Sequence, residues 1–492
     1  ILSGLVGSEM CIRDRALVAQ AKQLAIRQKT PDNVELLPKV GLEDISSELS
    51  DPIGEFLTVG TLPVAWYNQS GDGLLYQSLI VDIPALNDEE WLDLSFYDYY
   101  LTEMGCGERD YLANQTYCST VTGGIHSSYR LNTSPDDFNT IYQNFFIMGD
   151  ALVRNKIPLT KLLRETLQQP RFDELRLLRE CVSRSRINHE STLSSSALSF
   201  ARLTAGAGFS IITALNNRLN GPISLHYLQE LDDRLNDKNE LVAFAHRLTR
   251  LGERLANAPR RLLVIGETQE RETTLAAVMA IWGEASAVIQ SEEKLTFPLT
   301  TGPVREGLVL PVTVNYCVKA YPTVPYGHPD APALQVLGSL LQRNYLNQLV
   351  REQGGAYGVN AYYSSTAGLF YFTSNRDPEL GKTLQAFDHS LEWLVHAQPR
   401  QLEEAILNII KHLDHPVTPV QAATSSYLNS LKGWTTERYL EHRSRLLSLS
   451  LNDLREVANR WLVPDRASVV VASNRQTLDR EGERLGLVVK SV

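Results

Sequence analysis

Cysteine is scarce and scattered in this 492-residue chain. Its five cysteines have no CxxC spacing, so the sequence indicates neither a zinc knuckle nor a disulfide framework and favours a reducing compartment. No apolar run approaches the roughly 18 residues that a membrane-spanning helix needs, so we expect a soluble protein. An excess of basic residues is also missing, because the formal net charge is -10. Nucleic-acid binders need clustered Lys and Arg, so the composition argues against that class and suits a basic peptide ligand better.

The motifs of several enzyme classes are absent as well. Neither HxxEH nor HExxH occurs in the sequence, and without two such histidines on one helix face the chain has no catalytic zinc site of that kind. Gly206-Ala207-Gly208 matches neither GxGxxG nor a Walker loop, which argues against nucleotide binding. No GxSxG elbow supports a serine hydrolase.

The length predicts more than one domain, because domains average roughly 150 residues. Residues 1–15, "ILSGLVGSEMCIRDR", share no period with the residues after them, and we expect them to be a non-native artefact. The 3.6-residue apolar stripe from Ala16 to about Gln28 predicts a helix within a segment over 16–50. We then expect a first domain over 51–268, a polar connection over 269–303 and a second domain over 304–492.

The order of predicted elements repeats between these domains. In the first, "GLLYQSLIVDIPAL" predicts a strand, a helix capped by Asn87 comes next, a strand pair begins near Gly123, and "RRLLVIGET" closes the unit after a mostly helical stretch. In the second, "GLVLPVTVNYCVKAYP" predicts one strand, "APALQVLGSLLQRNYLNQLVREQ" a long helix, the next segment a hairpin through "STAG", and "RASVVVAS" a closing strand. Superposing Gly123-Gly124 on Gly354-Gly355 also aligns Pro135 with Pro378. An internal duplication of α+β units accounts for this order most simply.

One corner of the second unit, "LVREQGGAYG", carries candidate functional residues. Arg351 falls in the last turn of the long helix, where a cation complements the helix dipole, and Gly354 is the expected left-handed stop. A capped helix explains these residues but not Tyr357. Because Gly354 and Gly355 lack side chains, a bound peptide backbone can approach them, and Arg351 and Tyr357 can both point at one carbonyl oxygen. The corner is therefore either a structural cap or a substrate-binding site with two catalytic donors.

The run "VREQGGAYG", followed by "GLFYFTSNRDP" and a helix containing "LEWL", resembles the C-terminal half of the insulinase/pitrilysin (M16) metallopeptidases, closest to the presequence protease branch. "LTEMGCGERDYLANQTYCSTVTGGI" and "ISLHYLQELDDRL" resemble the preceding domain of that branch. The resemblance implies an α+β fold with two homologous M16-type (LuxS/MPP-like) α/β domains, the third and fourth of the family, each a mostly antiparallel sheet packed against helices. It also implies that 16–50 is the end of a helical linker between the two halves of the enzyme.

For function, the resemblance implies a zinc metalloendopeptidase that degrades unstructured peptides, such as targeting presequences, in a closed chamber. In that family HxxEH and a later Glu of the N-terminal half bind zinc and activate water, and Arg351 and Tyr357 match the Arg and Tyr that the C-terminal half lends to the substrate. The expected partners are a missing N-terminal catalytic half and unfolded peptides, with no nucleic acid and no membrane. The expected location is a bacterial cytoplasm or a mitochondrial matrix, and this chain alone is expected to be inactive. The alternative is a non-catalytic M16-like scaffold or partner subunit.

Several histidines are candidates for metal ligands or site residues. His412 and His415 are three residues apart, but Pro416 comes next and no third ligand is evident, which favours ordinary surface histidines. His189 lacks a second histidine at metal-binding spacing and is interpreted as part of a polar turn. His126 lies near the counterpart of Tyr357 in the duplication, where it is either a relic of the same corner or an ordinary strand histidine.

Overall fold

The computed structural model describes residues 14–24, 26–27, 40–46, 51–283 and 302–492. By backbone contacts the chain divides into Ile1–Glu48 and Leu49–Val492. The first segment contains a helix over residues 14–24 and 26–27, in agreement with the predicted one, and the short 3-10 helix η2 (Leu42–Asp44). Residues 1–13 of the expected artefact lie outside the described residues. Both sheets of the protein belong to the second segment, whose two units we call the first repeat (51–283) and the second repeat (302–492).

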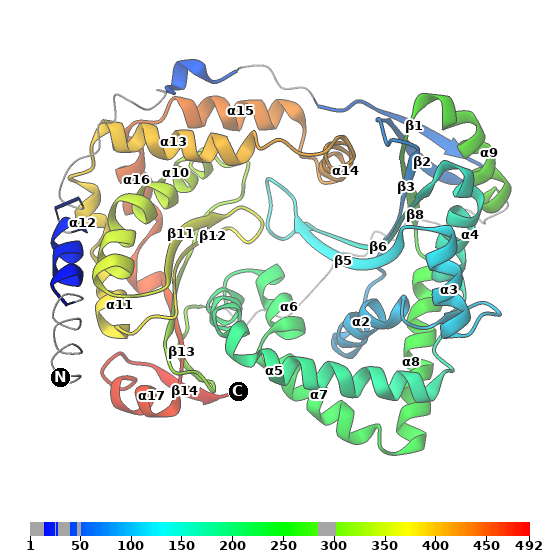
Figure 1. The fold of residues 1–492 in the computed structure, drawn as a ribbon, viewed down its shortest axis with the longest axis horizontal. Coiled ribbons are helices and arrows are strands. Elements are labelled where there is room, and N and C mark those ends of the chain that lie inside the picture. Colours follow the sequence, from blue (N-terminus) through cyan, green and yellow to red (C-terminus); the bar gives the residue numbers. More distant parts are fainter. Residues whose placement is uncertain (1–13, 25, 28–39, 47–50, 284–301) are drawn as a thin grey trace, which may run out of the picture. The chain divides into compact units, whose positions relative to one another are not determined.

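The first repeat is built on a six-stranded sheet with the order β1-β2-β8-β3-β6-β5 (Figure 1). Alternate side chains of its central strand enter two different cores, with Leu79 and Val81 on one face and Ile80 on the other. The α2 helix begins as predicted, because the Asn87 side chain accepts a hydrogen bond from the Glu90 N–H at 3.0 Å and the Glu90 carboxylate accepts one from the Asn87 N–H at 2.9 Å. The strands are β1 (Gly54–Val59), β2 (Leu62–Asn68), β3 (Leu74–Asp82), β5 (Gly124–Thr133), β6 (Ile141–Leu152) and β8 (Arg260–Gly266). A two-stranded ribbon joins β4 (Gly105–Cys106) to β7 (Pro170–Arg171), and the helices are α2 (Asp88–Leu101), α3 (Tyr111–Val121), α4 (Lys156–Gln168), α5 (Leu175–Ala207), α6 (Ile211–Asn220), α7 (Pro222–Arg234), α8 (Lys238–Ala256) and α9 (Arg271–Trp282).

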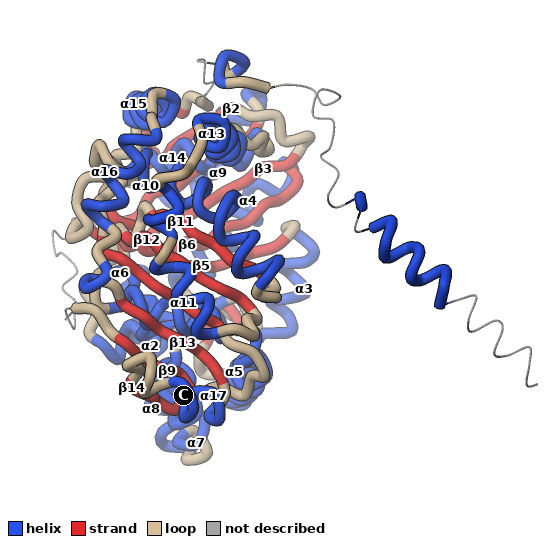
Figure 2. The backbone as a smooth tube through the Cα atoms, turned by 90° about the vertical axis from the view of Figure 1, so that its left-hand side faces the viewer, coloured by secondary structure: helices blue, strands red, loops and turns tan. Residues whose placement is uncertain are grey.

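The second repeat is built on another six-stranded sheet, with the order β11-β12-β10-β13-β9-β14. Its strands are β9 (Arg305–Val309), β10 (Tyr316–Pro322), β11 (Gly358–Ser364), β12 (Leu369–Asn375), β13 (Ser468–Ser473) and β14 (Val488–Ser491). The predicted hairpin is confirmed as β11 and β12, which pair antiparallel. Helices flank the strands of both sheets (Figure 2). In the second repeat they are α10 (Ala331–Leu341), the π-helix η5 (Gln342–Gln353), α11 (Leu380–Asp388), α12 (Ser390–Leu394), α13 (Pro399–Leu413), α14 (Pro419–Ser430), α15 (Thr436–Leu447), α16 (Leu451–Trp461) and α17 (Arg475–Glu481).

Five strands of each sheet share the same topology. Across the first sheet they run β2-β8-β3-β6-β5, and across the second β9-β13-β10-β12-β11, so strands in equal chain order occupy equal positions. The pairs β2/β8 and β9/β13 are both parallel, and the three remaining pairs of each sheet are antiparallel. Two homologous α+β units with mostly antiparallel sheets were predicted, and this prediction is confirmed.

The two repeats exchange helices across their sheets. The 33 residues of α5 span about 50 Å at 1.5 Å per residue, so its two ends meet different cores. Its first part buries Leu178 and Val182 in the core of the first repeat. Its last part lays Ala197, Ala201 and Ala205 on the second sheet, where small side chains at every fourth position allow close packing. In return, α14 of the second repeat covers the other face of the first sheet with Ala423, Tyr427 and Leu428. Each sheet is therefore sealed by a helix from the other repeat.

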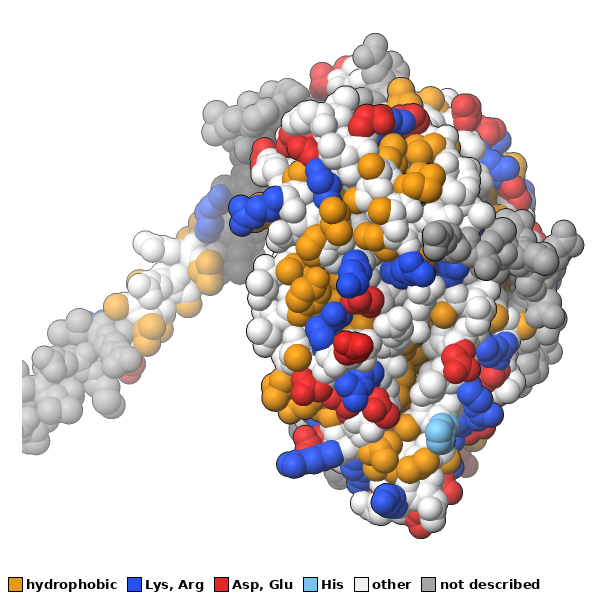
Figure 3. Space-filling model, turned by 90° about the vertical axis from the view of Figure 1, so that its right-hand side faces the viewer, with side chains coloured by type: hydrophobic (Ala, Val, Ile, Leu, Met, Phe, Trp, Pro, Cys, Tyr) orange, Lys and Arg blue, Asp and Glu red, His pale blue; other side chains and the backbone are white. Residues whose placement is uncertain are grey.

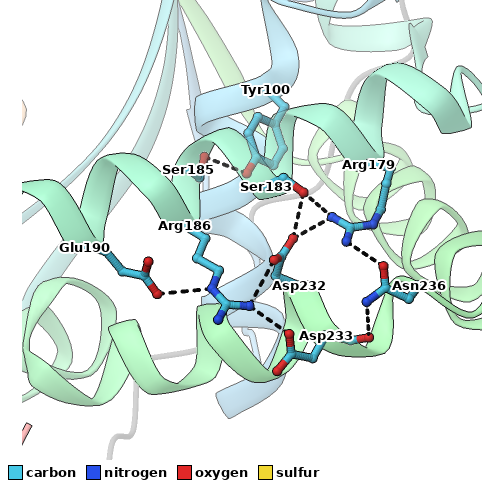
Figure 4. A network of polar contacts seen from close by, with 9 residues as sticks. All are labelled: Tyr100, Arg179, Ser183, Ser185, Arg186, Glu190, Asp232, Asp233 and Asn236. Atoms are coloured by element: carbon cyan, nitrogen blue, oxygen red, sulfur yellow. Dashed lines mark hydrogen bonds and ion pairs between the residues drawn. The ribbon is translucent and has the colours of Figure 1, made fainter.

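A polar network fixes the first part of α5 to α7 (Figure 4). Asp232 of α7 accepts hydrogen bonds from Ser183 at 2.9 Å, from Arg186 at 3.1 Å and from Arg179. Burial by itself raises the pKa of Asp232, but hydrogen bonds from Ser183 and the two arginines outweigh it and bring the pKa below its ordinary value. The network thus holds the long helix that reaches the second sheet.

Three local predictions were wrong. The single strand predicted over "GLVLPVTVNYCVKAYP" is two strands, β9 and β10, and Pro311 lies in the break because it has no N–H for a ladder. Pro135 lies in the loop between β5 and β6, whereas Pro378 comes after β12, so the two prolines do not correspond. Within the expected connection 269–303, residues 271–282 form α9, whose Trp282 is fully buried in the first core. The domain boundaries themselves remain a prediction.

Candidate functional site

The predicted corner lies where a π-helix ends and the edge strand β11 begins. The α10 helix continues into η5, which ends at Gln353. The Gly355 N–H donates to the Arg351 carbonyl at 3.1 Å, and the Ala356 N–H donates to the Val350 carbonyl at 3.0 Å. This is the paired cap that ends many α-helices, widened by one residue because the helix it ends is π-helical.

The widened cap moves the left-handed residue by one position. Gly355 has φ of +80°, whereas Gly354, the expected stop, has φ of -81° and is right-handed. The prediction for Gly354 was therefore wrong, although glycine is still required there. A Cβ on Gly354 would lie 2.6 Å from the Val350 carbonyl oxygen, closer than side chains and backbone approach each other.

Arg351 and Tyr357 stand on this corner with their side chains open to solvent. Arg351 is exposed in the last turn of η5, and Tyr357 is 70% exposed. Their backbones are fixed, because Ala356 between them is buried and the Tyr357 N–H donates to the Asn375 carbonyl at 3.1 Å. Among the described residues, neither side chain has a carboxylate partner. The corner thus presents a guanidinium and a phenol whose donors remain available to a ligand.

Sequence reasoning missed a third side chain at the corner. The Arg376 guanidinium lies over the Tyr357 ring, 5.5 Å from its centroid. Arg376 comes directly after the last residue of β12, and the Tyr357 N–H also faces its carbonyl at 3.4 Å. The run "GLFYFTSNRDP" contains this arginine, but nothing in the sequence distinguishes it from other strand-end arginines.

The first repeat has a degenerate version of the corner. Gly123 and Gly124 precede the edge strand β5, as Gly354 and Gly355 precede β11, and Gly124 has φ of +155°. His126 is exposed on β5 and pairs with Met148 of β6 in the ladder. No guanidinium stands at the corresponding place, since α3 ends in Ser119, Thr120 and Val121. Only the second repeat keeps the full pair of donors.

The remaining histidines form no metal centre. In the described part of the chain, no three His, Cys, Asp or Glu side chains lie close enough together to hold a metal ion. His412 ends α13 and His415 lies beyond that helix. His189 lies inside α5, so its interpretation as a turn residue was wrong, and its neighbour Glu190 accepts a hydrogen bond from Arg186 at 3.1 Å. Because the sequence also lacks HxxEH, the residues of this chain do not fit the catalytic zinc of the resembled family.

A cavity of about 600 Å³ lies between the repeats, away from the corner. It is bounded by the end of α5, by α6 and α7, and by β9 and the edge strand β14. Arg351 and Tyr357 belong to the opposite edge of the second sheet, beside β11. The cavity therefore plays no part in the arrangement of the two donors.

Charge and hydropathy add little to the site. On the face shown in Figure 3, basic and acidic side chains are interspersed, so the negative net charge is not gathered into one patch there. Among the helices that the structure describes, none combines the length and the apolar character needed to cross a bilayer.

Comparisons with known proteins point in one direction. Residues 13–231 match the family model of a region associated with peptidases of the M16 family, subfamily C, and residues 305–474 match "PreP C-terminal domain". The mitochondrial presequence protease of Yarrowia lipolytica is 28% identical over 461 residues, which cover 92% of this chain and 46% of that protein. The mitochondrial presequence protease of Danio rerio is 26% identical over 471 residues, covering 89% of this chain and 45% of that protein. The chain thus spans about half the length of these curated relatives. A solved "peptidase M16 inactive domain" from Pseudomonas fluorescens aligns with a TM-score of 0.60 at 14% identity, over 86% of this chain and 98% of that one, which shows a shared fold.

Proposed function

Since this chain belongs to the M16 peptidase family, as a C-terminal half of the presequence protease type, we propose that it works within a zinc metalloendopeptidase that degrades unstructured peptides such as presequences. The relatives that it matches are presequence proteases of about twice its span. The zinc ligands would lie outside this chain, in an N-terminal catalytic half, because the residues described here do not fit the metal. The two halves would enclose the peptide in a chamber, in a bacterial cytoplasm or a mitochondrial matrix.

The role proposed for this half is to hold the peptide carbonyl. Arg351 and Tyr357 would each donate a hydrogen bond to the carbonyl oxygen of the bond to be cleaved, which gains negative charge as the carbon becomes tetrahedral. Gly354 and Gly355 would let the peptide backbone approach the corner. Donors fixed before the reaction stabilise this charge without reorganising.

The observation that carries the proposal is the construction of the corner. A buried Ala356, a widened cap and a ladder hydrogen bond fix the backbone, while the two donors themselves stay exposed and without carboxylate partners in the described residues. A helix cap alone needs no phenol there. A chain with net charge of -10 also has carboxylates available, yet none of those that the structure describes neutralises the Arg351 guanidinium.

The test is Tyr357→Phe in the complete two-half protein. Loss of one oxyanion donor should lower kcat by about 10²-fold on an unstructured basic peptide while KM changes little. Tyr99→Phe is the matched control, since Tyr99 is an exposed tyrosine, 55% accessible, on α2. Equal losses in kcat and in peptide affinity would make Tyr357 a mere anchor, and an effect no larger than that of Tyr99→Phe would refute the role.

The alternative is a non-catalytic scaffold or partner subunit with the same fold. It is favoured by the solved neighbour described as an inactive domain, and it predicts that Arg351 and Tyr357 can be replaced without kinetic effect. A third possibility is a peptide-binding half whose catalytic half is encoded separately. Sequencing the gene upstream decides between these last two arrangements and the first, because an in-frame HxxEH supports one continuous enzyme and a stop codon supports two chains.

A further inference from the structure

Arg376 has a backbone conformation that a side chain disfavours. Its φ is +50°, and apart from Asp72 it is the only non-glycine residue with positive φ among the described residues. Left-handed backbone crowds the Cβ of an L-residue, so glycine or asparagine is usual at such positions. An arginine kept there suggests that its side chain has a task, because strained residues persist where the surroundings hold them and function uses them.

The surroundings of Arg376 do hold it. Asp377 is fully buried, and its backbone exchanges hydrogen bonds with that of Asn315 at 2.8 and 2.9 Å. The Asp377 carboxylate accepts a further hydrogen bond from the Glu379 N–H at 2.8 Å. On the other side, Asn375 is the last residue of β12 and pairs with Gly358 of β11. The left-handed turn is thus fixed by its neighbours, and the identity of residue 376 is left to its side chain.

That side chain is directed at the candidate site. The Arg376 guanidinium lies 5.5 Å from the centre of the Tyr357 ring, within the range of a cation–π contact. Arg376 is exposed, and the structure gives its guanidinium no carboxylate partner among the described residues. Tyr357 is itself 70% exposed, so few other atoms restrain its ring. The contact with Arg376 is therefore the main restraint on the direction of the phenol.

We propose that Arg376 is a positioning residue that holds the Tyr357 ring in the direction needed for its hydroxyl to reach the peptide carbonyl. The inference rests on the proposed function of the corner and adds a specific residue to it. The Arg376 guanidinium also brings a second positive charge, beside Arg351, to the place where a carbonyl oxygen would become negative.

The kinetic test uses the complete two-half protein with Arg376→Asn. Asparagine tolerates the left-handed backbone, so this variant removes the guanidinium without adding strain. We expect kcat on an unstructured basic peptide to fall about two- to fivefold, the loss that removal of an exposed cation–π contact implies, with KM and the unfolding midpoint nearly unchanged. Arg376→Lys should restore part of the activity. Asp72→Asn, at the other left-handed position, should have no effect.

A double variant separates positioning from direct action. If Arg376 acts through Tyr357, then Tyr357→Phe combined with Arg376→Asn should be no slower than Tyr357→Phe alone. Multiplied losses in the double variant would mean that Arg376 acts on the peptide itself, and would overturn the proposal.

A spectroscopic test isolates this inference from the proposed function. Fluorotyrosine placed at position 357 of the chain should show a fluorine NMR shift that moves toward that of the free amino acid when Arg376 becomes Asn, and that does not move with Asp72→Asn. An unchanged shift in the Arg376 variant would overturn the positioning role alone. A Tyr357→Phe variant with full kcat would instead overturn the proposed function, and with it any catalytic purpose of the contact, whatever the spectrum shows.

Discussion

Replacing Gly206 by alanine tests whether the two repeats are packed together through α5. Gly206 lies near the end of α5, and a Cβ there would lie 2.4 Å from the Tyr371 hydroxyl of β12, 2.7 Å from Thr213 Cγ2 and 2.9 Å from Leu369 Cδ1. Three contacts below 3.0 Å place this change at the upper end of overpacking, about 3 kcal/mol. Alanine regains ~0.5–1 kcal/mol by its better helix propensity. Gly206→Ala should therefore lower the free energy of unfolding by about 2 kcal/mol.

The closest atom in this contact supplies the control. Tyr371→Phe removes the hydroxyl at 2.4 Å but leaves the other two contacts. In that background Gly206→Ala should cost only about 1 kcal/mol, so the two changes should couple in a double-mutant cycle. Urea unfolding followed by far-ultraviolet circular dichroism measures all four proteins. If Gly206→Ala were neutral, or equally costly in both backgrounds, α5 would not be seated on the second sheet as described.

Two further predictions concern titratable groups. Asp232→Asn removes the anion between Arg179 and Arg186 and should destabilise by about 1–2 kcal/mol, less than for a fully buried pair because both guanidiniums stay partly exposed. Since the pKa of Asp232 is lowered by folding, its contribution should be present above the ordinary Asp pKa and lost as the pH falls through the folded one; urea midpoints that respond to acid equally in wild type and variant would contradict this. His442 is buried, stacks on Tyr326 at 4.3 Å and contacts Gln335 at 2.9 Å, and burial lowers its pKa to about 4. A lowered pKa stabilises the fold above about 6.5, the unfolded value, and this part should be lost between about 6.5 and 4 as the pH falls; His442→Gln should flatten the unfolding free energy over that range, and an unchanged slope would count against the assignment.

Much of the fold is readable from local patterns. Period-2 alternation and apolar runs predict β3, β8 and the β11/β12 hairpin, and Asn87 with Glu90 three residues later predicts the start of α2. The exchange of α5 and α14 is not readable in this way. A single helix that enters two cores has no one apolar stripe along its length, and the choice of partner sheet depends on contacts between distant residues.

The candidate site divides along the same line. Arg351, Tyr357 and the two glycines stand together in the sequence, so their meeting at one corner results from a helix end and a strand start. Arg376 contacts Tyr357 only because β12 returns beside β11 and then turns left-handed. The shift of the left-handed stop to Gly355 depends on the π-helical winding of η5, which no local sequence pattern predicts.

The most direct test of the central claim is a structure of the complete two-half protein with a peptide bound and the metal site occupied. The account predicts that the Arg351 guanidinium and the Tyr357 hydroxyl both lie about 2.7–3.1 Å from the same peptide carbonyl oxygen. A peptide bound elsewhere, or a corner with both side chains turned away from the peptide, would contradict it.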